Sequence, residues 1–243
     1  MVADGQRHVL AIGGFGARRE QDFQLPALIG HALELSGAAQ PRVCVLNTAA
    51  GDEPTGYVRM YAMLAQRGAR PSHLQLFSMP NVADTAGLLL SQDVIFVGGG
   101  SVANMVAVWR VHGLDDVLRQ AWEAGIVLAG VSAGAICWFD SGTTDSFGPV
   151  LRPFTAGLSL LPGSYCPHYS SEPTRRPAYE ALVADGTLPA GIACDDGAAV
   201  HFTGTKLAGI VADRAGATGY LVRPDGAGGS HQEQLDVATL LPG

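Results

Sequence analysis

A serine flanked by glycines stands where an apolar run gives way to a helical pattern. Residues 130–134 read GVSAG and precede the sequence AICWF, which can open a helix. A sharp strand-to-helix turn lifts a serine hydroxyl out of the sheet edge, and small residues at both ends let the backbone cross without clashes. The pattern predicts Ser132 as the nucleophile of a hydrolase. The simpler alternative is a glycine-rich turn that happens to contain a serine.

Three glycines, Gly98 to Gly100, follow another apolar run upstream of the serine. Ligands of an α/β sheet bind beyond the carboxyl ends of its strands, so both turns should open on the same edge. The N–H groups of Gly100 and Ala133 would then donate to a developing oxyanion. A phosphate-binding loop is the alternative, but no Gly-Lys-Ser/Thr follows these glycines. The earlier sequence GGFG at 13–16 has Arg19 where a dinucleotide fingerprint needs its third glycine, which argues against a dinucleotide-binding site there.

A serine hydroxyl needs a general base, usually histidine. His168 lies in a loop with apolar residues before it and polar residues after it, and such loops commonly carry catalytic residues. The other six histidines fall in expected strands, near expected helices or in a polar tail: His8, His31, His73, His112, His201 and His231. His168 is therefore the candidate base.

The base in turn needs an orienting carboxylate. Asp195 and Asp196 end a short apolar run before a glycine turn. They point to opposite faces if the chain is extended, so at most one can meet His168. Asp140 and Asp145 are further candidates, although each taken alone is better explained as a solvated loop carboxylate or a turn cap.

These segments together resemble the peptidase E family, which includes aspartyl dipeptidases and the related cyanophycinases. The matching stretches, in the family's order, are 96–101 (FVGGGS), 129–135 (AGVSAGA), 166–169 (CPHY) and 194–197 (CDDG). The resemblance implies a fold related to class I glutamine amidotransferases, which carry cysteine at this turn. It also implies that Ser132 is the nucleophile and His168 the base of a serine peptidase that works through an acyl-enzyme.

The chain departs from the family pattern at two positions. The family's third catalytic residue is usually glutamate just before a glycine or threonine turn, and the matching residue here is Asp196, which is one methylene shorter. Glu172 is another carboxylate that could take the place of Asp196 as the third catalytic residue. The family commonly has asparagine after the glycine run, where this chain has Ser101. Asp145 resembles a family aspartate near the active site.

The resemblance further implies dipeptide substrates with an N-terminal aspartate. A cation would match that carboxylate, and Arg175 and Arg176 closely follow His168. Their alternative is a solvated helix start before Pro177. A second enzymatic hypothesis is cyanophycinase-like cleavage of an Asp–Arg polymer, which ranks lower because no large insertion is evident. A non-catalytic binding or signalling relative is the hypothesis from another class.

Short apolar runs must position these residues. Strands are expected at 8–12, 42–46, 73–77, 93–97 and 126–131, and helices at 25–35, 57–66, 82–90, 102–110 and 114–122. This alternation predicts a doubly wound, mostly parallel α/β fold, flavodoxin-like by the resemblance. After Gly142 short β-like runs, such as 198–202 and 207–211, predict added and partly antiparallel C-terminal strands. We expect residues 1–243 to form a single domain.

The composition restricts the classes of partner that we expect this protein to bind. A formal charge of −7 argues against nucleic acid or an anionic membrane as the main partner. The N-terminus has no apolar signal core, and no apolar run approaches the roughly 20 residues that span a bilayer, so we expect a cytoplasmic protein. The four cysteines are scattered without a CxxC pair, which predicts buried thiols rather than zinc ligands or disulfides. We expect no metal and no cofactor. The expected substrate is a small peptide, and a homodimer is one possible oligomeric state.

Overall fold

The computed structural model of the chain describes residues 6–16 and 24–242. The first half contains the strands β1 (His8–Ile12), β2 (Arg42–Leu46), β3 (Arg70–Leu74), β4 (Val94–Val97) and β5 (Val127–Val131). Its helices are α1 (Ala27–Leu35), the short 3-10 helix η2 (Thr48–Ala50), α2 (Pro54–Ala65), α3 (Thr85–Leu90), α4 (Val102–Val111), α5 (Leu114–Glu123) and α6 (Ala133–Ile136).

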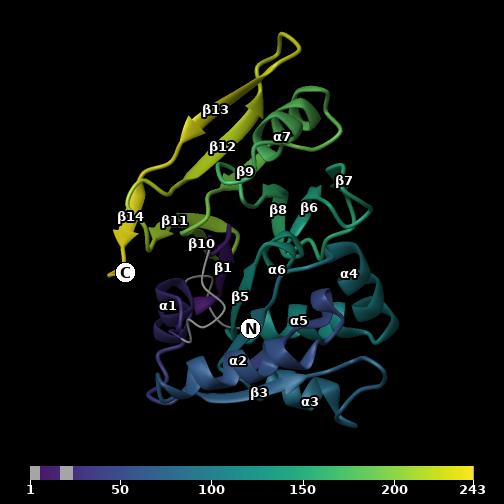
Figure 1. The fold of residues 1–243 in the computed structure, drawn as a ribbon, viewed down its shortest axis with the longest axis vertical. Helices are drawn as coiled ribbons and strands as arrows, with labels where there is room; N and C mark the ends of the chain where they lie inside the picture. The colour runs from purple at the N-terminus through teal and green to yellow at the C-terminus, as the bar shows by residue number, and fades with distance from the viewer. Residues whose placement is uncertain (1–5, 17–23, 243) are drawn as a thin grey trace.

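The second half is richer in strands. They are β6 (Phe139–Thr144), β7 (Arg152–Phe154), β8 (Leu161–Cys166), β9 (Gly191–Cys194), β10 (Ala198–Thr203), β11 (Lys206–Ala212), β12 (Gly219–Pro224), β13 (Ser230–Gln234) and β14 (Val237–Leu240). One helix, α7 (Arg175–Ala184), lies among them. Figure 1 shows the first half in the lower part of the view and α7 with β12 and β13 at the top.

The first sheet has eight strands in the order β14-β11-β10-β1-β5-β4-β2-β3. The five strands from β1 to β3 in that order are parallel to their neighbours, and β10 pairs with β1 antiparallel. Parallel strands need helical crossovers, and the helices between them provide these connections. The expected doubly wound, mostly parallel α/β fold is confirmed.

Helices cover both faces of this sheet, which explains why its central strands are apolar throughout. Successive residues of each strand face opposite sides of the sheet, so Val9 and Leu10 of β1 belong to different core clusters. On one face the sheet packs against α1 and α2. On the other face it packs against α4 and α5, where Trp109 and Trp122 are buried.

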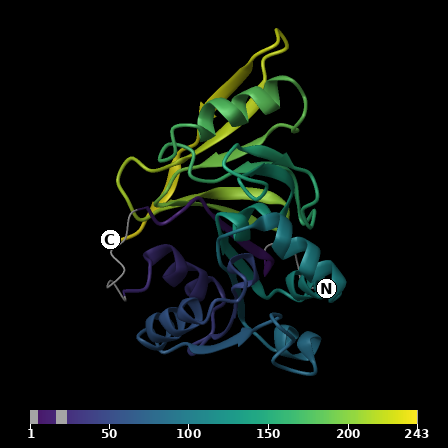
Figure 2. The same ribbon diagram turned by 45° about the vertical axis from the view of Figure 1, so that its right-hand side comes forward.

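The expected strands after Gly142 are present, and they divide between two sheets. Strands β10, β11 and β14 extend the first sheet, whereas the other six form a second sheet in the order β13-β12-β9-β8-β6-β7. Figure 2 shows this second sheet, with α7 against it, above the helix-covered sheet. Tyr165 and Ile192 of the second sheet belong to the same core cluster as α4 and α5, so the two sheets share one apolar face.

One expected strand was placed wrongly. The third strand is Arg70–Leu74, not 73–77, because Asp52 draws the following residues into a loop. Its carboxylate accepts hydrogen bonds from the backbone N–H groups of Leu76 and Phe77, at 2.6 and 3.0 Å. The helix expected after Ser132 is present as α6, which has four residues, and the strand β6 begins at Phe139.

The four cysteines are free and buried, as the sequence predicted. Burial raises the pKa of the Cys44, Cys166 and Cys194 thiols to about 12. Within residues 6–16 and 24–242, no helix is both long enough and apolar enough to cross a bilayer.

Candidate active site

Ser132 lies at the tip of a strained turn between β5 and α6. Its φ of 55° and ψ of −115° are costly for a residue with a side chain, so neighbouring contacts must hold it. Its N–H donates to the carbonyl of Ile12 at 3.1 Å. Small flanking residues are required as expected, because a Cβ on Gly130 would lie 2.0 Å from the Gly134 carbonyl oxygen.

The structure brings Ser132, His168 and Asp196 into one hydrogen-bonded chain. Nε2 of His168 lies 2.9 Å from Oγ of Ser132, and Nδ1 lies 2.7 Å from Oδ1 of Asp196. An ionised carboxylate can only accept, so Nδ1 carries the proton and Nε2 is left to accept the serine hydroxyl. This is the tautomer that a general base requires.

The electrostatics of Asp196 favour its ionised form. Partial burial would raise the pKa of its carboxyl group, but hydrogen bonds from His168 and Ser171 lower it, as do the charges of His168 and Arg214. The net pKa lies below the ordinary value for aspartate. Asp196 is therefore an anion at neutral pH and can stabilise a positively charged imidazole.

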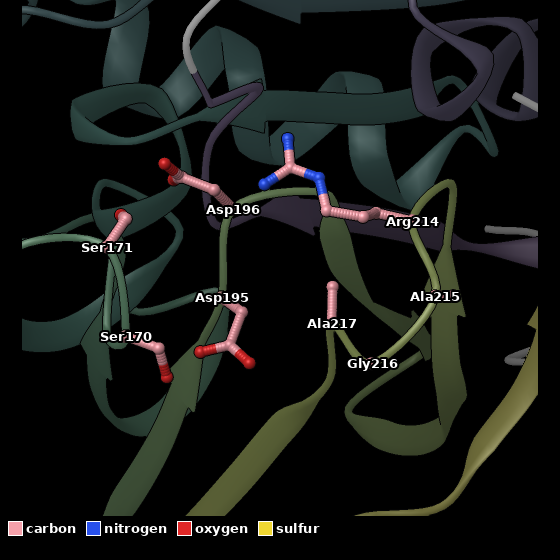
Figure 3. Close-up of a pocket in the computed structure, with 8 residues that line it drawn as sticks. All are labelled: Ser170, Ser171, Asp195, Asp196, Arg214, Ala215, Gly216 and Ala217. Atoms are coloured by element: carbon pink, nitrogen blue, oxygen red, sulfur yellow. The ribbon is translucent and has the colours of Figure 1, made fainter.

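The other aspartates that the sequence offered have different partners. Asp195 is buried, and its Oδ2 accepts from the Thr218 N–H at 3.2 Å and from the Tyr220 hydroxyl at 3.5 Å. Figure 3 shows the Asp195 and Asp196 carboxylates pointing away from each other. Asp140 instead accepts from the Gly163 N–H at 2.8 Å. The side-chain alternation read from the sequence thus agrees with the structure.

The end of β1 holds both Ser132 and His168 through backbone hydrogen bonds. The carbonyl of Ile12 accepts from the Ser132 N–H, and the next carbonyl, that of Gly13, accepts from the His168 N–H at 3.3 Å. His168 itself has a φ of 55°, so this contact stabilises a backbone conformation that its side chain disfavours. The segments that carry Ser132 and His168 are therefore both positioned by the same strand end.

Gly14 extends this backbone support to the segment that carries Asp196. Its carbonyl accepts from the Gly197 N–H at 2.8 Å, directly after Asp196. A Cβ at Gly14 would lie 1.9 Å from Oδ1 of Asp196 and 2.5 Å from Nδ1 of His168. The sequence showed only a glycine pair ending a strand, and sequence reasoning missed its role because the residues that it supports are more than 100 positions away.

The glycine run after β4 lies beside Ser132. A Cβ at Gly99 would lie 3.4 Å from Cβ of Ser132. Gly100 is exposed, and its φ of 135° and its closeness to the Ala49 carbonyl both require glycine. Among the described residues, the N–H groups of Gly100 and Ala133 have no protein acceptor. Ser101 caps α4, since its Oγ accepts from the Asn104 N–H at 3.2 Å.

The two candidate arginines at the start of α7 have different surroundings. Arg175 is buried, and its Nε donates to Glu172 at 2.6 Å while Asp145, which is exposed, lies 4.0 Å from its Nη2. Arg176 lies over the ring of Tyr169, 4.6 Å from the ring centre, and donates to the Ser170 hydroxyl. The hydrogen bonds of the His168 ring within the described residues go to Asp196 and Ser132, not to Glu172 or Asp145.

A polar pocket of about 330 Å³ adjoins the acid end of this chain. Figure 3 shows its lining: Ser170, Ser171, Asp195, Asp196, Arg214, Ala215, Gly216 and Ala217. The guanidinium of Arg214 extends toward Asp196, and it donates to the Phe15 carbonyl at 3.3 Å. Arg214 carries no sequence signal, because only the fold brings the loop after β11 to this edge. Among the described residues, no cluster of His, Cys, Asp or Glu could hold a metal ion.

Comparison with known proteins identifies the family. The profile of peptidase family S51 matches residues 9–210. The chain is 44% identical over 216 residues to the "Uncharacterized peptidase YgaJ" of Bacillus subtilis, which covers 89% of this chain and 92% of that protein. It is 29% identical over 156 residues to "Peptidase E" of Shewanella denitrificans, covering 60% and 66% of the two chains.

A solved structure has the same fold. The crystal structure of a peptidase from an acI-B1 Actinobacterium matches with a TM-score of 0.65 and 17% identity, over 95% of this chain and 94% of that one. The residues matched by the family profile include Ser132, His168 and Asp196. The chain belongs to peptidase family S51 and is a serine-type peptidase.

Proposed function

We propose that Ser132, His168 and Asp196 form the catalytic triad. The observation that carries this proposal is the unbroken hydrogen-bonded chain from Ser132 Oγ through His168 to Asp196. His168 would take the hydroxyl proton as Oγ attacks the peptide carbonyl, and would then give it to the leaving amine. Asp196 holds the ring and stabilises the imidazolium that forms between these steps. Water then hydrolyses the acyl-enzyme by the same route.

The backbone N–H groups of Gly100 and Ala133 are the proposed oxyanion hole. Ala133 directly follows Ser132 and Gly100 follows Gly99, which lies beside it, and their lack of a protein acceptor leaves both N–H groups available for the oxygen that becomes negative during attack. Gly99 supports this geometry because it places the glycine run directly beside the serine: a Cβ at position 99 would be in ordinary van der Waals contact with Cβ of Ser132, at 3.4 Å. The cap that Ser101 makes on α4 supplies the anchoring expected of the residue after the glycine run.

The proposed substrates are dipeptides with an N-terminal aspartate, as the family resemblance implies. Of the two candidate cations, Arg176 suits the substrate carboxylate better. The charge of Arg175 is already offset by Glu172 and Asp145. Arg176 forms no ion pair with any described carboxylate, and the faces of Tyr169 and Tyr220 keep its guanidinium in place.

Hydrolysis of Asp-Leu, Asn-Leu and an Asp–Arg polymer tests the proposal. Asp-Leu should be cleaved, and Ser132→Ala should lose on the order of 10⁶ in kcat and should not react with a fluorophosphonate probe. Asn-Leu should be cleaved about 10- to 100-fold more slowly, because it lacks the charge that pairs with the cation. Faster cleavage of the polymer than of Asp-Leu would favour the cyanophycinase-like reading instead.

Two matched variants locate the cation. Arg176→Gln should abolish the preference for Asp-Leu over Asn-Leu, mainly through KM. Arg175→Gln should keep that preference and lower the melting temperature, because it leaves Glu172 without its partner. The opposite assignment of these two effects would show that Arg175 is the residue that binds the substrate carboxylate.

A further inference from the structure

An apolar pocket of about 210 Å³ opens at the carboxyl edge of the first sheet, between α1 and α2. Its walls include Ile29 of α1, Met60 and Met63 of α2, and Phe96 of β4. Ile29, Met63 and Phe96 are buried. An apolar cavity of roughly 150 Å³ can hold a benzene molecule, so this pocket has room for one branched or aromatic side chain.

The pocket adjoins the reacting groups. Val131, which directly precedes Ser132, lines it, as does Gly98, which begins the proposed oxyanion loop. Ligand sites in open α/β sheets lie beyond these strand ends. A substrate whose carbonyl lies between Ser132 and the glycine run therefore has the pocket within one residue of the scissile bond.

The pocket and the candidate arginines lie on different sides of this edge. Met60 and Phe96 belong to the core cluster formed with α1 and α2. Helix α7 instead contacts β6, β12 and β13 of the second sheet, and its buried Tyr179 and Val183 form a separate cluster with Val222 of β12. Two side chains of a short peptide bound across Ser132 would reach these two regions separately.

We infer that the pocket binds the side chain of the substrate's second residue, the residue whose amine is the leaving group, and that it selects large apolar side chains there. This inference rests on the proposed function, which assigns the aspartate to a cation. A dipeptide has only two side chains, and an aspartate carboxylate would lose its hydration among methionine and phenylalanine side chains. Arg59 also lines the pocket, and its charge has the sign that suits the free C-terminal carboxylate of that residue.

A series of Asp-Gly, Asp-Ala, Asp-Leu and Asp-Phe measures the selection. Leucine has three more carbon atoms than alanine, and burial of each is worth a factor of about four. The ratio of kcat/KM for Asp-Leu over Asp-Ala should thus be on the order of 50-fold. Met60→Trp, which fills the pocket, should reduce this ratio to within a few-fold of one. Val58→Trp is the matched control, because Val58 lies on the same helix and is 67% exposed, and it should leave the ratio unchanged.

Binding of amino-acid amides to the Ser132→Ala protein tests the pocket without turnover. Leucine amide should shift the NMR signals of the Met60 and Met63 methyl groups, and alanine amide at the same concentration should not. A ratio near one for the two dipeptides, together with no leucine-induced shift of either methyl, would overturn the pocket assignment and leave the triad intact. Absence of any Asp-X hydrolysis and of fluorophosphonate labelling would instead overturn the proposed function, and the methyl shifts would still decide the pocket.

Discussion

The substitution Gly14→Ala adds one methyl group next to the proposed base, His168, and the proposed acid, Asp196. The new Cβ would lie 1.9 Å from Oδ1 of Asp196 and 2.5 Å from Nδ1 of His168. Gly14 is not among the residues with a positive φ, so the backbone itself accepts alanine. The effect of the substitution is therefore steric and falls on the 2.7 Å hydrogen bond between the two side chains.

The expected loss follows from that geometry. The carboxylate must retreat by more than about 1 Å to restore an ordinary van der Waals distance, which breaks its hydrogen bond to the ring. A displacement of about 1 Å in a catalytic group costs roughly 10²-fold, and complete loss of the orienting carboxylate costs roughly 10⁴-fold. Gly14→Ala should therefore lower kcat for Asp-Leu by about 10²- to 10⁴-fold.

The assay is steady-state hydrolysis well below the melting temperature, with circular dichroism to show that the variant is folded. Gly30→Ala is the control, because its Cβ would lie 3.9 Å from the nearest atom, on Arg67, and alanine suits the interior of α1. A folded Gly14→Ala protein with kcat close to that of the wild type would refute the reasoning, since it would mean that the His168–Asp196 contact is dispensable.

The remaining predictions concern the acid and the pH dependence of stability. Asp196→Asn should lower kcat by roughly 10⁴-fold, whereas Asp195→Asn should stay within about 10-fold of the wild type; comparable losses in both would remove Asp196 as the specific partner of His168. Burial, followed by the charges of His8 and His31, lowers the pKa of His201 from 6.5 to about 4, so the unfolded chain binds more protons between these values. The free energy of unfolding should accordingly fall as pH drops from about 6.5 toward 4. Urea titrations at pH 7 and pH 5 should show a smaller decrease in the free energy of unfolding for His201→Gln than for the wild type. An equal decrease in the two proteins would count against the role of His201.

Local patterns in the sequence were sufficient for the parallel sheet and for the proposed nucleophile and base. Strand–helix alternation and apolar runs depend on neighbouring residues, and GVSAG combines the small residues and the strand-to-helix position that such a turn needs. Side-chain alternation along an extended chain showed only that at most one of Asp195 and Asp196 can meet His168, and the family resemblance, which places the acid just before a turn glycine, chose Asp196. The family resemblance directed attention to His168 and to this pair of aspartates.

Other features were decided only by contacts between distant parts of the chain. The third strand ends at Leu74 because Asp52 binds the next amides, and no pattern within the strand reports that contact. Arg175 is a buried ion-pair residue while Arg176 is stacked on two rings, a difference that two adjacent arginines do not reveal.

The support given by the end of β1 is the clearest case. Ile12, Gly13 and Gly14 each accept a hydrogen bond from a different segment of the proposed triad, and all three segments are more than 100 residues away. In the sequence these residues are only the end of a strand. Periodicity and turn chemistry act over a few residues, whereas the need for glycine at position 14 comes from the space left between His168 and Asp196, which exists only once the chain has folded.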